Sequence, residues 1–262
     1  MKSPKISVLM AVYNEQHTLQ SAIQSVLDQT NQDWELVIID DSSIDNTYNL
    51  LQEYAKQYPN NIRVYRNNRN LGLAASLNKG LDLCSGEYIA RKDADDWSYP
   101  ERLEKQLNYM EHHPEIDLLG TGAELIGTDG NVRNIFFLPK CHDDIKRIAL
   151  KKTMIFHPSV MIRKSFFDRV GKYKAKLRRA QDLELWIRGL QYGCKYHNLQ
   201  EVHIQYATNG YVRSFNTIIE KFFSKLYVCF KYKYYLRIIN VFLELIKSIL
   251  IKLQIYTPRS IK

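Results

Sequence analysis

Three aspartates in the run Asp93-Ala94-Asp95-Asp96 are the residues of this sequence whose spacing is best suited to chemistry. Residues i and i+2 of an extended segment point to the same side, so Asp93 and Asp95 can reach one ligand. Ligand sets made only of oxygen atoms are typical of Mg²⁺ or Mn²⁺, which needs few protein ligands when it also binds a diphosphate. The spacing alone fits equally well a solvated acidic turn before Pro100, with Asp96 as a helix cap.

Two further polar clusters follow apolar runs that have the composition of strands. Tyr13-Asn14-Glu15 follows the run Ile6–Val12, and Asp40-Asp41-Ser42-Ser43 follows the run Leu36–Ile39. In an open parallel sheet, ligands bind beyond the carboxyl ends of the strands, so the three polar clusters are expected to converge. The sequence has neither GxGxxG nor GxxxxGK followed by Ser or Thr, which excludes those two types of phosphate-binding loop.

The elements that would position these clusters alternate between strand and helix in the first half, as in parallel α/β proteins. Near-continuous apolar runs predict strands covered on both faces, and apolar residues at helical spacing predict helices. The predicted strands are Ile6–Val12, Leu36–Ile39, Ile62–Tyr65 and Glu87–Ala90. The predicted helices are one that carries Leu19, Ile23, Val26 and Leu27, one after a cap at Asp45, one at Leu73–Leu83, and one that starts at Pro100.

The second half is less regular. Asp129-Gly130 predicts a hairpin turn, Ser159–Ile162 a short strand, and Leu183–Leu190 a helix. From Thr217 onward the chain is aromatic, aliphatic and rich in lysine, with almost no Gly or Pro.

The basic charge of the chain is concentrated at its end. The 262 residues carry 37 Lys and Arg against 28 Asp and Glu, a net charge of +9. Residues 211–262 hold 10 of the basic and 2 of the acidic residues, a net of +8, which leaves +1 for the other 210. A nearly neutral body with a basic tail indicates no nucleic-acid partner. The four cysteines lie far apart without a CxxC pair, which argues against a disulfide framework or a cysteine zinc site.

Six segments of the chain stand in an order that resembles one known family. These segments are Ser7–Glu15, Ile38–Ser43, Asn70–Gly80, Gly86–Asp96, His157–Val160 and Gln181–Arg188. Together they closely resemble glycosyltransferase family 2, whose members are inverting enzymes that use nucleotide sugars. The resemblance implies the GT-A fold, a Rossmann-like and mostly parallel sheet. It implies a catalytic domain over residues 1–210, with a nucleotide-sugar half to about residue 115 and an acceptor half after it. The tail over 211–262 carries no motif of the family, and its composition predicts basic amphipathic helices.

The resemblance also implies a donor site for a UDP-sugar. Its residues would be Ala11, Tyr13, Glu15, Asp40, Asp93 and Asp95. Tyr13 would stack on the uracil-type base, and Asp40 would accept a hydrogen bond from the ring N–H of that base. Glu15 would lie beside them at the rim of the site. Asp93 would contact the ribose, and Asp95 would hold Mn²⁺ or Mg²⁺ between the two phosphates.

On the acceptor side, Asp182 matches the general base of the family. Such a carboxylate removes the proton of the acceptor hydroxyl. The family usually has Glu-Asp here, whereas this sequence has Gln181-Asp182. The side chain at the first position, which would contact the acceptor, is therefore neutral instead of negatively charged. His157 matches a histidine near the acceptor. A helix cap for Asp182 and a structural histidine for His157 are the alternative interpretations.

These expectations predict a metal-dependent transferase that uses a lipid-linked saccharide as acceptor in surface-polysaccharide or O-antigen assembly. Its predicted place is the cytoplasmic face of a membrane, where the tail would bind an anionic surface as amphipathic helices. The alternative for the tail is packing on the catalytic domain or in a homodimer. The alternative for the whole chain is a non-catalytic relative that binds nucleotide sugars or acts as a scaffold.

Overall fold

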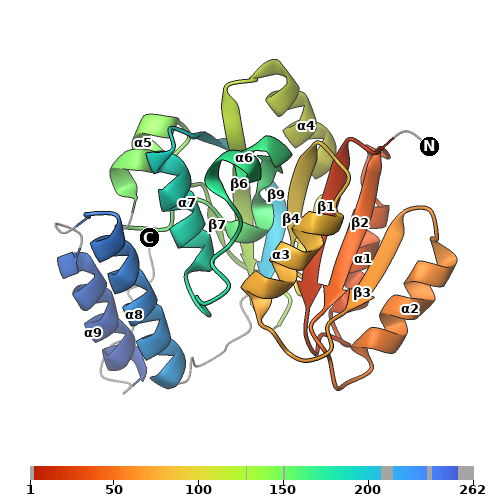
Figure 1. Cartoon of the computed structure of the whole chain (residues 1–262), viewed down its shortest axis with the longest axis horizontal. Helices are drawn as coiled ribbons and strands as arrows, with labels where there is room; N and C mark the ends of the chain where they lie inside the picture. Colours follow the sequence, from red (N-terminus) through yellow and green to blue (C-terminus); the bar gives the residue numbers. More distant parts are fainter. Residues whose placement is uncertain (1–2, 128, 150, 208–214, 235–237, 253–262) are drawn as a thin grey trace.

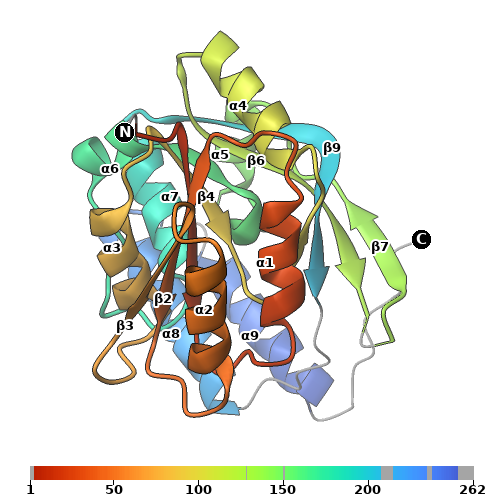
Figure 2. The same cartoon turned by 90° about the vertical axis from the view of Figure 1, so that its right-hand side faces the viewer.

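The computed structural model describes residues 3–127, 129–149, 151–207, 215–234 and 238–252. Within these ranges, nine strands form one sheet with helices on both faces (Figure 1, Figure 2). The strands are β1 (Ile6–Val12), β2 (Trp34–Asp40), β3 (Ile62–Arg66), β4 (Tyr88–Lys92), β5 (Trp97–Ser98), β6 (Ile116–Ile126), β7 (Val132–Phe136), β8 (Met161–Arg163) and β9 (Lys195–Ala207). The helices are α1 (Leu19–Leu27), α2 (Thr47–Gln57), α3 (Leu73–Leu83), α4 (Arg102–His112), α5 (His142–Ile148), α6 (Lys164–Val170), α7 (Gln181–Gln191), α8 (Phe215–Lys231) and α9 (Ile238–Lys252).

The strand order is β3-β2-β1-β4-β8-β6-β9-β5, and β7 pairs with β6. Strands β1 to β4 run parallel, whereas β8 is antiparallel to both of its neighbours, β4 and β6. In the register of β1, Val12 lies beside Asp40 and Met10 lies beside Lys92. The three polar clusters that follow these strands therefore meet at one edge of the sheet.

Alternate residues of β1 enter two hydrophobic clusters, one on each face of the sheet. Val8 and Met10 pack with residues of α1, α2 and α4, and Leu9 packs with residues of α3, α6 and α7. A strand covered on both faces has no polar face, which explains the near-continuous apolar run in the sequence. The predicted elements of the first half are thus confirmed, with shifts of one to a few residues at their ends.

The second half departs from the sequence-based expectation at two places. The predicted strand Ser159–Ile162 is wrong at its start, because a 3₁₀ turn occupies His157–Ser159 and the strand runs over Met161–Arg163. The sequence does not predict the 13-residue strand β9. Its buried and exposed positions do not alternate regularly, so its sequence lacks the period of two that marks a strand. The hairpin at Asp129-Gly130 is confirmed by the antiparallel pairing of β6 and β7.

The tail forms two helices, α8 and α9, which lie side by side at the end of the molecule opposite α2 (Figure 1). Phe222, Val228 and Cys229 belong to the hydrophobic cluster that contains the buried side of α7. The packing interpretation is therefore confirmed for one face of this hairpin. No helix in the described ranges is long and apolar enough to span a bilayer. The expected boundary at residues 210–211 and the last ten residues of the tail lie outside the described residues.

Candidate active site

A cavity of about 430 Å³ lies at the carboxyl ends of β1 and β4. Five of the six residues expected at the donor site line it, namely Ala11, Tyr13, Glu15, Asp93 and Asp95. The structure thus brings together residues that are up to 84 positions apart in the sequence. Tyr13 is 42% exposed, so a flat ligand can reach its side chain.

Two left-handed residues turn the chain sharply at this edge. Asn14 has φ 57° and Ser42 has φ 65°. The side-chain oxygen of Asn14 accepts a hydrogen bond from the Ile44 N–H at 2.9 Å, and the Asn14 N–H donates to Ser43 Oγ at 3.0 Å. These reciprocal bonds tie the ends of β1 and β2 together, so the positions of the first two polar clusters are fixed relative to each other. The cost of left-handed backbone at non-glycine residues is about 1–2 kcal/mol each, which such bonds help to offset.

Asp40, the sixth expected donor residue, does not line this cavity. Its carboxylate is fully buried, where it pairs with Arg66 Nε at 3.1 Å and accepts from the Ser43 N–H at 3.3 Å. The expected contact between Asp40 and the base therefore stays a prediction. The next residue, Asp41, lines the cavity and accepts bonds from the backbone N–H groups of Leu71 and Gly72 at 2.9 and 2.7 Å. Asp41 holds the loop that leads into α3, a role that the sequence alone did not suggest.

Asp93 is held by a buried cation. Arg91 Nη2 lies 2.5 Å from Asp93 Oδ1, and the Arg91 side chain is 2% exposed against 28% for Asp93. Burial raises the pKa of Asp93, but the charge of Arg91, its hydrogen bond and the electrostatic interactions with His157 and Lys92 together lower the pKa by more, so the net shift is downward. Asp93 is therefore an ionised carboxylate at neutral pH, and its ion pair with Arg91 fixes the orientation of its side chain. Because Arg91 precedes Asp93 by two residues in an extended segment, the sequence carried a signal for this pair.

The other carboxylates of the cavity repel one another. Burial, followed by the charge of Asp93, raises the pKa of Asp95. Burial also raises the pKa of Glu15, to which Asp95 and Asp93 add, although a 2.9 Å hydrogen bond from Thr18 opposes the shift. Such a cavity favours a cation, because a bound divalent ion would relieve both the burial and the repulsion of these charges.

The donor set fits Mg²⁺ or Mn²⁺, since it consists of carboxylate oxygens that face one cavity. In the described ranges, no three His, Cys, Asp or Glu side chains lie close enough to hold a metal ion by themselves. At a site with one or two protein ligands, water and a diphosphate would complete the coordination. Asp96 has a different environment, because it is buried and accepts a hydrogen bond from the Ala207 N–H at 3.0 Å. Burial, followed by the charges of Asp93 and Asp95, raises the pKa of Asp96 to about 8.

A second cavity, of about 660 Å³, lies between α7 and the tail hairpin. Gln181 and Asp182 line it at the start of α7, and Leu73 and Arg179 line both this cavity and the first. The two cavities therefore adjoin. Ala180, the residue before α7, is left-handed with φ 54°, so the chain turns sharply just before these two side chains.

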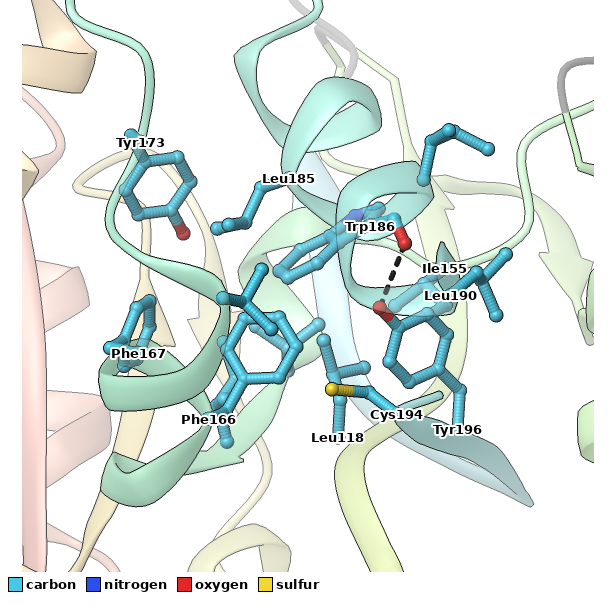
Figure 3. Packing of buried hydrophobic residues seen from close by; sticks show 14 of the residues in the cluster. Leu118, Ile155, Phe166, Phe167, Tyr173, Leu185, Trp186, Leu190, Cys194 and Tyr196 are labelled. Carbon is cyan, nitrogen blue, oxygen red and sulfur yellow. Dashed lines mark hydrogen bonds between the residues drawn. The ribbon is translucent and has the colours of Figure 1, made fainter. Parts of the chain in front are cut away.

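Buried side chains hold helix α7 against the core (Figure 3). Trp186 is 1% exposed, and its carbonyl accepts a hydrogen bond from Tyr196 Oη at 2.8 Å. A Cβ atom at Gly189 would lie 2.0 Å from Tyr196 Oη, so only glycine allows this close approach. Arg188 donates to the carbonyls of the loop before α7, including Lys172 at 2.7 Å. A functional carboxylate on such a helix has little freedom to move.

His157 is not among the described residues that line either cavity. Its Nε2 is 2.8 Å from Tyr173 Oη, and its ring packs edge-on against Trp186. Burial, followed by the charge of Arg91, lowers the pKa of His157 to about 4. His157 is therefore neutral at pH 7, and its contacts here are structural.

The sequence profile named Glycosyl transferase family 2 matches residues 7–171, which include the whole acidic edge of the sheet. The chain belongs to glycosyltransferase family 2. Over 200 residues, the transferase is 39% identical to EpsE of Bacillus subtilis, assigned as a glycosyltransferase, with 76% of this chain and 71% of EpsE covered.

Two relatives from Escherichia coli carry more specific names. The O-antigen biosynthesis glycosyltransferase WbnJ is 30% identical over 78% of this chain and 80% of its own length. The UDP-Gal:alpha-D-GlcNAc-diphosphoundecaprenol beta-1,3-galactosyltransferase is 29% identical over 76% of this chain and 73% of its own length. The relatives of the transferase thus include enzymes of bacterial polysaccharide biosynthesis.

The fold of the transferase is also that of solved glycosyltransferases. A mannosyltransferase from Pyrobaculum calidifontis, solved with GDP-Man and Mn²⁺, superposes with a TM-score of 0.65 over 92% of this chain and 73% of its own. The sequence identity is 15%, so this similarity establishes the GT-A fold and nothing finer. The expected fold class is confirmed.

Proposed function

We propose that this glycosyltransferase moves a sugar, with inversion, from a UDP-sugar to a lipid-linked saccharide in surface-polysaccharide assembly at the cytoplasmic face of a membrane. The observation that carries the proposal is the pair of adjoining cavities that share Leu73 and Arg179. A transfer reaction needs two substrates held against each other, and a shared wall provides that arrangement. The name of the E. coli galactosyltransferase supports the donor and acceptor classes, and that of WbnJ supports a role in O-antigen assembly.

In the proposed reaction, the oxygen of an acceptor hydroxyl attacks the anomeric carbon of the donor sugar from the side opposite the diphosphate. The new C–O bond forms as the bond to the diphosphate oxygen breaks, and its electron pair leaves with UDP. The carboxylate of Asp182 takes the hydroxyl proton. Because bond formation and bond breaking occur on opposite faces, the configuration of the anomeric carbon inverts.

The residues of the first cavity would hold the donor. Tyr13 stacks on the base, Glu15 lies at the rim, and Asp93 contacts the ribose in the direction fixed by Arg91. Asp95 would hold Mn²⁺ or Mg²⁺, which when bound offsets the charge that develops on the leaving diphosphate. The raised pKa of Asp95 supports this assignment, because it marks a carboxylate that gains from a nearby cation.

The donor class can be tested by thermal unfolding with Mn²⁺ present. A UDP-sugar at 100 times its dissociation constant should stabilise the protein by about 2.7 kcal/mol, and GDP-sugars should stabilise it less. A stabilisation that is equal for UDP- and GDP-sugars would contradict the assignment of the base.

A non-catalytic relative would show the same stabilisation without turnover. We expect UDP release above the rate of donor hydrolysis when a pool of lipid-linked saccharides is added to the protein with donor and Mn²⁺. Donor binding with no release from any acceptor of the pool would favour the binding or scaffold role.

The outer face of the tail hairpin supports the proposed membrane contact. Large apolar side chains that are 45–69% exposed gather on α8 and α9, namely Phe223, Tyr227, Phe230, Ile239, Phe242, Leu243 and Ile246. Exposed apolar groups next to basic residues are typical of helices that lie in the interface of a membrane. The chain around the hairpin carries most of the net positive charge, which anionic lipids attract.

Surface variants test this contact better than removal of the tail, because removal would also expose Phe222, Val228 and Cys229 of the core. The triple variant Phe223→Ser, Phe230→Ser and Leu243→Ser should lower binding to phosphatidylglycerol vesicles by more than tenfold, since burying such a side chain contributes about 1.5–3 kcal/mol. Co-sedimentation with vesicles measures this.

The matched control is Val132→Ser with Ile135→Ser, two exposed apolar residues of β7. It should bind vesicles as the unmodified protein does. Binding of the unmodified protein should weaken with salt without vanishing, because only its electrostatic part is screened. An unmodified protein that ignores anionic vesicles at low salt would rule out the membrane contact.

A further inference from the structure

The cavity between α7 and the tail hairpin has a strong excess of positive charge. Among the described residues, six basic side chains line it, namely Lys152, Arg178, Arg179, Lys221, Lys225 and Lys247. Two carboxylates line it as well, Asp182 and Glu244. Lys225 forms an ion pair with Glu244, and Arg179 lies 3.7 Å from Glu220 of α8. With Glu220 included, the six basic side chains still outnumber the three carboxylates. Such a wall attracts a multiply charged anion.

The adjoining donor cavity has the opposite charge. Of the residues that the structure describes, four carboxylates and a single cation line it, namely Glu15, Asp41, Asp93, Asp95 and Arg179. A diphosphate can enter the acidic cavity only with a metal ion that offsets its charge, whereas the basic cavity can hold a diphosphate without metal. The two cavities therefore suit two different phosphate-bearing ligands.

We propose that the basic cavity binds the diphosphate of a phosphate-linked acceptor, and that the tail lysines Lys221 and Lys247 supply part of the site. This inference rests on the proposed transfer function and assigns its acceptor end. The basic cavity has a volume of about 660 Å³, which lies within the range of roughly 300–1,000 Å³ that is typical of small-ligand sites.

The start of α7 supplies the other end of the site. Gln181 is 8% exposed and lines the cavity, and its Oε1 atom has no hydrogen-bond partner among the described residues. A buried amide oxygen without a partner is costly, and a sugar hydroxyl would satisfy it. The sugar of the acceptor thus lies at Gln181 and Asp182, with its diphosphate toward the lysines of α8 and α9.

The lysine-bearing wall is fixed to α7 by buried contacts. Glu184, which is fully buried on α7, accepts bonds from Arg188 at 2.8 Å, from Lys231 at 3.2 Å and from the hydroxyl of Tyr232. Lys231 is the last residue of α8 and Tyr232 follows it, so the network joins the tail to the helix that carries Asp182. The same hairpin exposes its apolar face outward, where the lipid part of an acceptor could stay in the bilayer.

The test uses inorganic diphosphate as the probe, in EDTA and at constant ionic strength, with calorimetry as the measurement. The full chain should bind it, and the double variant Lys221→Gln with Lys247→Gln should bind it about 10- to 100-fold more weakly, because hydrogen bonds to charged groups are among the strong ones. Lys56→Gln, an exposed lysine of α2 at the opposite end of the molecule, should leave the affinity unchanged. Lys152→Gln provides an independent variant outside the tail.

Binding of UDP with Mn²⁺ and the midpoint of thermal unfolding should be unchanged in all variants. If the unmodified protein itself does not bind UDP with Mn²⁺, the donor proposal fails, independently of this cavity. If the full chain does not bind diphosphate, or if Lys56→Gln weakens it equally, the inference is wrong.

A second arm distinguishes an acceptor diphosphate from the phosphates of bilayer lipids. Diphosphate should not release the protein from phosphatidylglycerol vesicles at matched ionic strength. Release by diphosphate would show that the cavity binds lipid headgroups and would overturn its assignment to the acceptor.

Discussion

Replacing Asp182 by Asn is expected to lower sugar transfer by about 10²–10⁴-fold while binding of the UDP-sugar persists. Asn has the shape of Asp and can still accept a hydrogen bond, but it cannot take the proton of the acceptor hydroxyl. The side chain lies at the start of a helix whose other face is buried, so the substitution should not disturb the fold. Single-turnover transfer with a saturating donor measures the loss.

Glu244→Gln is the matched control for Asp182→Asn, because Glu244 is the other carboxylate of the same cavity. It removes an equal charge without removing the proposed base, so transfer should fall much less. If Asp182→Asn lowers transfer by less than about tenfold, another group is the base and Asp182 is a helix-start residue.

Replacing Asp95 by Ala is expected to abolish Mn²⁺-dependent binding of UDP. Asp95 is the residue assigned to the ion, and the described residues offer no third metal-ligating side chain that could compensate. The fold should survive, because the raised pKa of Asp95 means that its ionised carboxylate lowers the stability of the folded protein at neutral pH, so its removal costs no favourable charge interaction. Calorimetric titration of UDP with Mn²⁺ and with EDTA, beside a thermal unfolding curve, measures both effects.

Asp129→Ala, an exposed residue of the β6–β7 hairpin, controls for the loss of a surface carboxylate. Its UDP titration should match that of the unmodified protein. Unchanged Mn²⁺-dependent turnover in Asp95→Ala would remove Asp95 from the metal site, and the second candidate would then be Asp93.

The structure also changes how the tail is understood. The sequence posed a choice between a membrane-binding tail and a packed one, and the structure assigns packing to one face of the hairpin. The opposite face remains exposed and apolar, so the membrane contact is a proposal for that face alone. An amphipathic pattern shows that a helix has an apolar side, but protein and lipid satisfy that side equally well.

The sequence by itself determined the acidic edge of the sheet, because its signals are local. Each polar cluster directly follows an apolar run, and parallel strands bring their carboxyl ends to the same edge whatever the rest of the fold does. The pairing of Val12 with Asp40 and of Met10 with Lys92 reproduces that expectation. These local signals left a metal site and a solvated acidic turn as alternatives, and only the resemblance to glycosyltransferase family 2 favoured the metal site.

Only the tertiary structure decided how the acceptor half meets this edge. Strand β8 pairs with β4 across more than 70 residues of sequence, and this antiparallel pairing places α7 next to the donor cavity. The fully buried Asp40, the wall shared through Arg179 and the lysines of α8 and α9 beside Asp182 all depend on such long-range contacts. Hydrophobic periodicity specifies which side of a helix or strand is buried, but it does not specify which distant segment covers that side.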